Sequence, residues 1–344
     1  MAMLEVKNLC AFYGKAQALS DVSISVEQGE TIAIVGANGA GKSTLLDSVM
    51  GLVKNTGSIH LDGQDITGKK TGHMVRAGIG YAPERFNLFP HMTVRDNLMV
   101  GAYTARTDIE KNMAAVHRLF PRLAERESQE TSTQSGGERQ MVSLGRALMS
   151  SPRVLLVDEP TIGLDPHQVI MIRDLIASLR GKMSVIISSH ILPEIEMTCD
   201  QVIIINGGKI VGKGTPNELR ETFIDSTIYE LEINGDLGDL RESLKNVASN
   251  LEIAQYTEAD ERGFSKVTIR IPGRHDYGEM LFSCLSDNPL IRTRSLRMRE
   301  APLEDVFLAA TRRSWETLDA DLTNKPERID SETEEKEVST AGQQ

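Results

Sequence analysis

One run of eight residues limits what this chain can fold into: Gly36-Ala37-Asn38-Gly39-Ala40-Gly41-Lys42-Ser43, which fits the phosphate-binding pattern G-x-x-x-x-G-K-[ST]. The apolar residues 31–35 before it predict a buried strand, and residues 44–50 after it have the spacing of an amphipathic helix that ends at Gly51. Strand, glycine loop and helix in this order are the context that the motif requires. These flanks favour a loop that holds a nucleoside triphosphate over a glycine turn without a ligand.

The residue types in this loop match the chemistry of a polyphosphate. Glycines allow backbone N–H groups to turn inward at the N-terminus of a helix, where negative charge is already favoured. Lys42 is expected to reach the β- and γ-phosphates of ATP, and the Ser43 hydroxyl to ligate Mg²⁺. The predicted nucleotide-binding residues of the loop are Gly36, Asn38, Gly39, Ala40, Gly41, Lys42, Ser43 and Thr44.

Length and composition limit the class of protein. The 344 residues, 40% hydrophobic and 25% charged, predict a globular protein of two domains. No apolar stretch approaches the length of a membrane span, and the start does not resemble a secretory signal. The three cysteines lack a C-x-x-C pair and are expected to be free thiols in a reducing cytosol. The net charge of −11 without a concentrated basic face makes nucleic acid an unexpected partner.

The chain divides into three predicted parts. Residues 1–225 carry short alternating strands of an antiparallel piece, then the phosphate loop, a helical insertion at about 90–135, and apolar strands separated by a helix as in a parallel α/β unit. Residues 228–311 read β-α-β-β-α-β, with strand-like runs that include 229–233 and 264–271 and a first helix that runs to about Ser249. This order predicts a small α+β domain of the ferredoxin-like class. Residues 315–344 hold nine acidic and three basic side chains and predict an acidic, disordered tail.

The last strand of the second domain carries four arginines: Arg292, Arg294, Arg297 and Arg299. A solvated strand face is favoured over an anion-binding site, because charge runs usually face water.

A second motif lies at the end of the apolar run 154–157. Asp158 follows this predicted strand and is the candidate for the Mg²⁺ shell, and Glu159 is the candidate that orients or deprotonates the attacking water. Alone, such an acidic pair would be interpreted as a surface turn. Its place after the phosphate loop and before Pro160 favours the catalytic interpretation.

A third motif decides the family. Gln134-Ser135-Gly136-Gly137-Glu138-Arg139-Gln140 precedes a predicted helix, and places a hydroxyl and successive N–H groups at its N-terminus as a second anion-binding cradle. Alone, it would be a loop. With the two nucleotide motifs, in this order, residues 3–220 resemble the ATP-binding subunits of ABC transporters, and this run resembles their signature motif.

The resemblance implies further site residues. Tyr13 resembles the aromatic residue that stacks on adenine, although a core tyrosine is the alternative. Asp165 lies in Gly163-Leu164-Asp165-Pro166, which is similar to the D-loop, and His190 resembles the histidine that senses the γ-phosphate rather than a structural residue. Two positions depart from the family pattern: Gln134 stands where the signature has Leu, and Glu84 stands where Gln normally meets Mg²⁺ and the membrane partner.

The two halves resemble different branches. Residues 3–150 are most similar to ATPases of branched-chain amino-acid importers, and residues 163–311 to those of ABC-2-type exporters. The resemblance implies an ATPase that forms a head-to-tail homodimer around ATP, with Ser135, Gly136 and Gly137 of one copy on the nucleotide of the other. It further implies a separate integral membrane permease and a cytoplasmic location, peripheral on the inner face of the cell membrane.

A second hypothesis from another class is a non-transport ABC ATPase acting on nucleic acid or ribosome partners. Long coiled coils or tandem nucleotide domains would support it, and the sequence contains neither.

Overall fold

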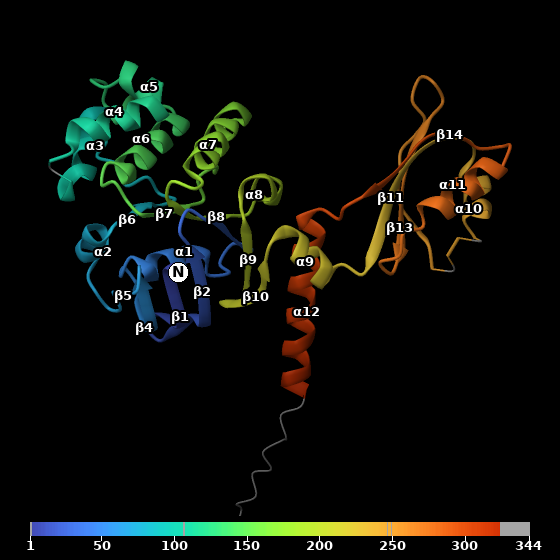
Figure 1. Ribbon diagram of the computed structural model, residues 1–344, viewed down its shortest axis with the longest axis horizontal. Coiled ribbons are helices and arrows are strands. Elements are labelled where there is room, and N and C mark those ends of the chain that lie inside the picture. The colour runs from blue at the N-terminus through green and yellow to red at the C-terminus, as the bar shows by residue number, and fades with distance from the viewer. Residues whose placement is uncertain (1, 106, 246, 249, 324–344) are drawn as a thin grey trace, which may run out of the picture.

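The computed structural model describes residues 2–105, 107–245, 247–248 and 250–323, with side chains as far as residue 313. Two sheets and the helices around them form one lobe, and a smaller sheet with two helices forms a second (Figure 1). No helix within these described ranges is long and apolar enough to cross a membrane.

The first sheet is antiparallel, as expected from the alternating pattern near the start. Its strands are β1 (Ala2–Tyr13), β2 (Ala16–Glu27), β4 (Lys54–Leu61) and β5 (Gln64–Asp65), in the order β2-β1-β4-β5. The alternating side chains bury one face and leave the other polar, which is how an antiparallel sheet meets water on one side.

The second sheet positions the site. Its order is β10-β9-β3-β8-β7-β6, and its strands are β3 (Thr31–Val35), β6 (Ile79–Ala82), β7 (Val154–Asp158), β8 (Ser184–Ser189), β9 (Gln201–Asn206) and β10 (Lys209–Gly214). Strands β3, β8 and β7 are neighbours, parallel and fully buried. Because parallel strands end at the same edge, the segments after all three meet there.

The helices of the first lobe are α1 (Lys42–Val49), α2 (Thr71–Ala77), α7 (Pro166–Leu179), α8 (Leu192–Thr198) and α9 (Pro216–Phe223). The expected helical insertion is present as α3 (Val94–Gly101), η1 (Ala102–Thr104), α4 (Ile109–Leu119), α5 (Pro121–Glu125) and η2 (Thr131–Thr133), followed by α6 (Gly136–Leu148). Most of its buried apolar side chains join the same core as the parallel sheet.

The second lobe is residues 226–299, which we call the appended unit. It contains β11 (Ser226–Asn234), α10 (Leu237–Leu244), β12 (Glu252–Tyr256), β13 (Ser265–Pro272), α11 (Gly278–Asp287) and β14 (Arg292–Arg299). The sheet order is β12-β13-β11-β14, all antiparallel. Helices α10 and α11 cover one face over a separate apolar cluster. Helix α10 ends at Leu244, before the residue 249 at which the sequence pattern places its end.

The other face of this sheet is polar. Arg294 pairs with Glu232 at 2.6 Å and with Asp260 at 3.2 Å, and Arg299 pairs with Glu230 at 2.6 Å. Such ion pairs at the surface are typical of a strand face that meets water.

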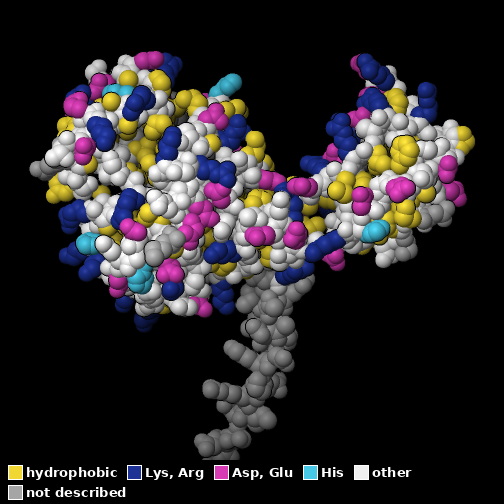
Figure 2. All heavy atoms as spheres, in the orientation of Figure 1, with side chains coloured by type: hydrophobic (Ala, Val, Ile, Leu, Met, Phe, Trp, Pro, Cys, Tyr) yellow, Lys and Arg dark blue, Asp and Glu magenta, His cyan; other side chains and the backbone are white. Residues whose placement is uncertain are grey.

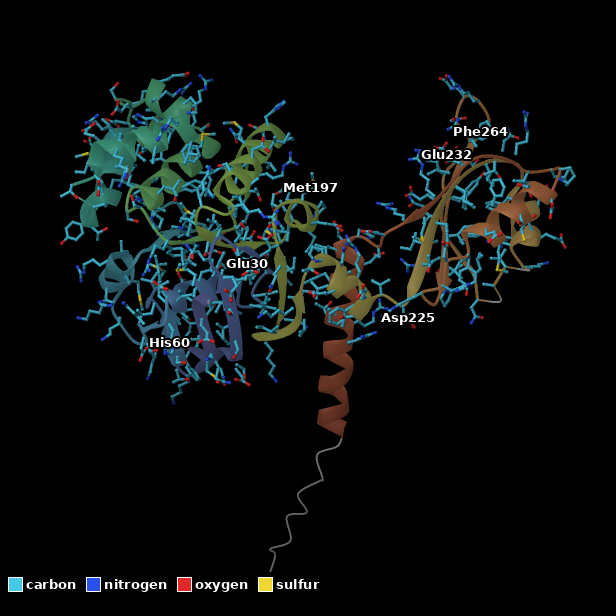
Figure 3. All side chains as sticks on the ribbon, in the orientation of Figure 1. Glu30, His60, Met197, Asp225, Glu232 and Phe264 are labelled. Carbon is cyan, nitrogen blue, oxygen red and sulfur yellow. The ribbon has the colours of Figure 1, made fainter. Side chains whose placement is uncertain are left out.

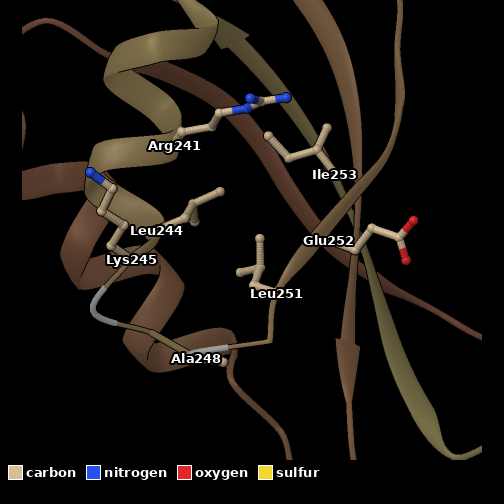
Figure 4. A pocket seen from close by; sticks show the side chains of 7 residues that line it. All are labelled: Arg241, Leu244, Lys245, Ala248, Leu251, Glu252 and Ile253. Carbon is tan, nitrogen blue, oxygen red and sulfur yellow. The ribbon is translucent and has the colours of Figure 1, made fainter.

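A cavity of about 450 Å³ lies at the β12 edge of this sheet, between α10 and β12, where Leu244, Leu251 and Ile253 project into the space (Figure 4).

Helix α12 (Leu303–Thr323) returns to the first lobe, where its side chains Leu303, Val306 and Ala310 are buried in the core beside the parallel sheet. Their spacing of three and four residues gives the helix an apolar stripe that packing stabilises. The composition of residues 315–344 predicts a disordered tail, but residues 315–323 continue this helix. Residues 324–344 lie outside the described part of the chain.

A buried phenol holds the appended unit together. Tyr229 is 1% exposed; its hydroxyl donates to Asp276 Oδ1 at 2.6 Å and accepts from the Tyr277 N–H at 2.7 Å. Burial raises the pKa of Tyr229 to about 12, so it remains a donor at neutral pH. The hydrogen bond from Tyr229 lowers the pKa of the Asp276 carboxyl.

We therefore expect Tyr229→Phe to destabilise the appended unit by about 1–3 kcal/mol, because it removes a buried hydrogen bond to a charged group. Amide hydrogen exchange of β11 and β13 measures this locally. Since the folded pKa of Asp276 is depressed, its contribution is present above its unfolded value near 3.8 and is lost as the pH falls through the folded value. The difference in stability between the unchanged protein and Tyr229→Phe should therefore shrink in that acidic range.

Tyr256→Phe is the matched control, because Tyr256 is 41% exposed and its hydroxyl contacts an uncharged partner, Ser265 Oγ, at 3.1 Å. Equal exchange rates in the two variants would contradict the role given to Tyr229.

Candidate functional site

The phosphate loop joins β3 to α1 in a conformation that requires its glycines. Gly39 has a φ of 81° and Gly41, the residue that caps α1, has a φ of 113°. A Cβ on Gly41 would lie 2.6 Å from Leu19 Cδ2, and one on Gly36 would lie 2.5 Å from the Ile205 carbonyl oxygen. Both the backbone angles and the close neighbours therefore exclude side chains here.

Lys42 is buried at the start of α1. Its Nζ donates to the Gly36 carbonyl at 2.9 Å and to the Ala37 carbonyl at 3.4 Å, and it forms an ion pair with Glu159 Oε1 at 3.0 Å. The ammonium group thus lies under the loop, at the edge where β7 ends.

Glu159 is held in an unusual backbone conformation. Its φ is 46°, in the left-handed region that few non-glycine residues adopt, and its N–H donates to Ser188 Oγ at 2.9 Å. The side chain is 5% exposed, and its second oxygen lies 2.7 Å from His190 Nδ1. One carboxylate therefore joins the lysine of the loop to the histidine after β8. Such a strained residue is tolerated where its surroundings fix it, and this occurs most often at functional sites.

Asp158 is joined to the loop by hydroxyl groups. Ser43 Oγ donates to Asp158 Oδ1 at 3.1 Å, and Ser188 Oγ donates to the same oxygen. Ser188 is a site residue for which no motif predicted a role, although it lies two residues before His190. A serine at the end of an apolar strand was the sequence feature that could have identified it. In the structure, the register of β7 and β8 pairs Asp158 directly with Ser188.

Two tyrosines flank the loop. Tyr13 is 53% exposed, with its hydroxyl 3.5 Å from Thr44 Oγ1, so it is not the core residue that the alternative interpretation required. Tyr81 donates to Asp47 Oδ1 at 2.9 Å on α1. Burial raises the pKa of Asp47, and the nearby charge of Asp158 raises it further against the hydrogen bond from Tyr81.

The signature turn lies at the N-terminus of α6. Ser135 caps the helix, with its Oγ accepting from Glu138 N at 3.2 Å while Glu138 Oε2 accepts from Ser135 N at 2.9 Å. Asp165 caps α7 through Gln168 in the same way. The two turns are packed together, because a Cβ on Gly137 would lie 2.2 Å from the Gln168 side chain.

This turn does not reach the phosphate loop of its own chain. Within the described residues, no hydrogen bond or ion pair joins Ser135, Gly136 or Gly137 to residues 36–43. Gln134, the residue before Ser135, stands where the family signature has Leu. It is 5% exposed, and neither polar atom of its side chain has a hydrogen-bond partner in the described part of the chain.

Glu84 belongs neither to the contacts around the phosphate loop nor to those of the signature turn. Its side chain is exposed and has no ion pair or hydrogen bond among the residues that the structure describes. The loop that follows it is fixed instead by Arg146 of α6, which donates to the carbonyls of Phe86 and Asn87, both at 2.7 Å.

Comparison with known proteins matches residues 19–162 to the family described as ABC transporter. The chain is 40% identical over 212 residues to the high-affinity branched-chain amino acid transport ATP-binding protein BraG of Pseudomonas aeruginosa, covering 61% of this chain and 91% of that protein. It is 32% identical over 328 residues to the Nod factor export ATP-binding protein I of Rhizobium etli, covering 92% and 95%. It is 31% identical to the linearmycin resistance ATP-binding protein LnrL of Bacillus subtilis, covering 91% and 99%.

Solved structures agree with this result. An ATP-binding subunit of an ABC transporter superposes with a TM-score of 0.58 at 30% identity, covering 64% of this chain and 93% of that one. An ATP-binding cassette in its ADP conformation superposes with a TM-score of 0.56 at 27% identity, covering 63% and 92%. The nucleotide-binding lobe is therefore the ABC ATPase fold that the motifs predicted.

Relatives that match nearly the whole chain, and a lobe that places a phosphate loop beside an acidic strand end, lead to one conclusion: the chain belongs to the ATP-binding, ATP-hydrolysing subunits of ABC transporters.

Proposed function

We propose that two copies of this chain form a head-to-tail dimer around ATP and drive export through a separate membrane permease. One observation carries the proposal: Lys42, Glu159 and His190 form a single chain of contacts at the sheet edge, while in the described part of the chain Ser135 and its turn make no polar contact with the phosphate loop. The phosphate loop is therefore half of a site, and the signature turn of a second copy supplies the other half.

Each residue has a role that follows from its position. Lys42 neutralises charge on the β- and γ-phosphates, where its fixed ammonium group stabilises the transition state. Glu159 orients the attacking water and accepts its proton as the oxygen bonds to the γ-phosphorus and the bond to the β-phosphate oxygen breaks. His190, held by Glu159, contacts the γ-phosphate. Tyr13, half exposed beside Thr44, stacks on adenine.

The donor set at Ser43 and Asp158 fits Mg²⁺. Both offer oxygen atoms, which this ion prefers, and Ser43 Oγ lies 3.1 Å from Asp158 Oδ1. No cluster of three His, Cys, Asp or Glu that could hold a metal by itself occurs in the described residues. Ser43 and Asp158 would hold the ion together with nucleotide phosphate and water, and the ion would neutralise charge on the phosphates. The exposed position of Glu84 favours contact with the permease over a place in this shell.

The groove beside the insertion suits the permease. A cavity of about 360 Å³ lies between α2, β6 and the insertion, with a largely apolar lining that includes Val75, Val100 and Tyr103. Val100 is 42% exposed and Tyr103 is 66% exposed. Arg146 also lines this groove, so an occupant would touch the α6 helix that carries Ser135 at its other end. Such a partner would keep the chain on the inner, cytoplasmic face of the cell membrane.

The relatives support export. Those that match more than 90% of this chain are named for Nod factor export and linearmycin resistance, whereas the one named for branched-chain amino-acid transport matches 61%. We propose that the appended unit, residues 226–299, is a ferredoxin-like accessory domain of the exporter type, which the sequence pattern places at 228–311. The order β12-β13-β11-β14 supports that class, and the packing of α12 supports assigning this helix to the nucleotide-binding domain at 1–225.

Glu159→Gln should retain ATP binding but lower turnover by about 100-fold or more, because the amide does not accept the proton of water. The variant should accumulate as an ATP-bound dimer, which size-exclusion chromatography and a phosphate-release assay will detect. Glu125→Gln, on the exposed surface of α5, is the control. Near-normal hydrolysis in the Glu159 variant would contradict its assignment.

Mixing two inactive variants tests the shared site. Lys42→Ala damages the loop, and Gly136→Asp damages the signature turn without straining the monomer, because a Cβ there meets no atom closer than 3.7 Å. Each variant alone should lack activity, whereas the mixture should recover part of it, since a mixed dimer contains one intact site. Absence of recovery, with mixed dimers present, would show that the signature acts within its own chain.

Val100→Asp should weaken the complex with a co-expressed permease while basal ATPase activity is unchanged, because it places a charge in the apolar groove. Co-purification and ATP hydrolysis measure the two effects. Leu290→Asp, at an exposed apolar site of the appended unit (64% exposed), is the matched control. Equal retention of the permease by both variants would exclude the groove as its binding surface.

A further inference from the structure

Arg220 of α9 joins three separate segments at the connection between the lobes. The connecting segments 224–225 and 300–302, which we call the neck, lead into and out of the appended unit. Arg220 Nε donates to the Ala301 carbonyl at 2.7 Å, and Nη1 contacts Asn217 Oδ1 at 2.7 Å and Glu300 Oε2 at 3.3 Å. Its Nη2 forms an ion pair with Glu196 of α8.

These contacts are not those of a loose surface charge. The Arg220 side chain is 12% exposed, so its guanidinium group is largely removed from water. Glu196 is 31% exposed, whereas Glu300 is 72% exposed, which makes the contact with α8 the better protected of its two ion pairs. The planar guanidinium group of an arginine binds several partners in a fixed arrangement, whereas the ammonium group of a lysine is a flexible point charge.

Helix α8 connects this arrangement to the site. It begins at Leu192, two residues after His190, and the intervening Ile191 N–H donates to Ser189 Oγ at 3.0 Å at the end of β8. Its residues Leu192 and Ile195 are buried in the core cluster that also contains Leu303 and Val306 of α12. Helix α8 is thus held by Arg220 on one side and by the core beside α12 on the other. Because α8 starts two residues after His190, a shift of either contact would be passed to His190.

The appended unit is itself tied to the neck. Arg270 of β13 pairs with Asp305 of α12 at 3.2 Å, and Arg274 Nε donates to the Ile224 carbonyl at 3.3 Å. Charged side chains of both signs gather over the neck (Figure 2), between Met197 of α8 and Asp225 before β11 (Figure 3). The appended unit therefore reaches α8 through fixed polar contacts.

We propose that Arg220 is a positioning residue for His190: by tying α8 to the segment that returns from the appended unit, it couples the position of that unit to the contact of His190 with the γ-phosphate. The inference rests on the proposed role of His190. A displacement of the appended unit would thereby alter how the site distinguishes ATP from ADP.

The test is the preference for a non-hydrolysable ATP analogue, adenylyl imidodiphosphate, over ADP, with both dissociation constants measured by calorimetry on the full chain. Arg220→Met should lower this preference by about three- to tenfold, in the range of contact-network couplings, with ADP affinity unchanged. His190→Ala should lower it at least as much. In the double variant, Arg220→Met should add no further loss, because the two residues act through one contact.

Control variants separate the contacts of Arg220. Glu196→Ala breaks only the α8 contact and should reproduce the loss, whereas Glu300→Ala breaks only the exposed contact and should have no effect. An unchanged preference in Arg220→Met, or a full additional loss in the double variant, would overturn the inference while leaving His190 in place. An unchanged preference in His190→Ala would refute the role of His190 itself, and that of Arg220 with it.

Discussion

The buried ion pair between Lys42 and Glu159 is the contact on which the nucleotide site depends. Both side chains are nearly removed from water, and an unpaired charge in such a place costs about 3–5 kcal/mol. The pair is possible only because β3, β8 and β7 are parallel neighbours that end at one edge. The same edge brings His190 to Glu159 and Ser43 to Asp158, so a single strand order assembles the phosphate loop, the two carboxylates and the histidine.

Arginine contacts with backbone carbonyls help to hold both the insertion and the appended unit. Arg146 of α6, the helix that begins at the signature turn, holds the loop after Glu84, and Arg220 of α9 holds the return of the appended unit beside α8. Each guanidinium group satisfies carbonyls that regular structure leaves free. Directed polar contacts thus add to apolar packing in joining these parts to the first lobe.

Much of this was predictable because local patterns decide local structure. The apolar run at 31–35 and the helical spacing at 44–50 predicted the strand and the helix on either side of the glycine loop. The succession of strands and helices along the appended unit followed from its pattern, including the alternating runs at 229–233 and 264–271. The length of α10 and the helix at 315–323 were not predictable: the first ends earlier than its pattern, and the second extends a helix that tertiary packing of Leu303 and Val306 stabilises.

The sequence by itself determined the chemistry: a phosphate loop, an acidic strand end, a signature turn and a histidine, each specified within a few residues. The tertiary structure decided which of these meet. It joined Glu159 to Lys42 and His190 and brought in Ser188 through strand register. Among the residues it describes, Ser135 and Glu84 make no polar contact with the phosphate loop. The reason is physical: a motif fixes the backbone over a few residues, whereas contacts between motifs depend on how strands far apart in the chain pair and on which face of the lobe each helix buries.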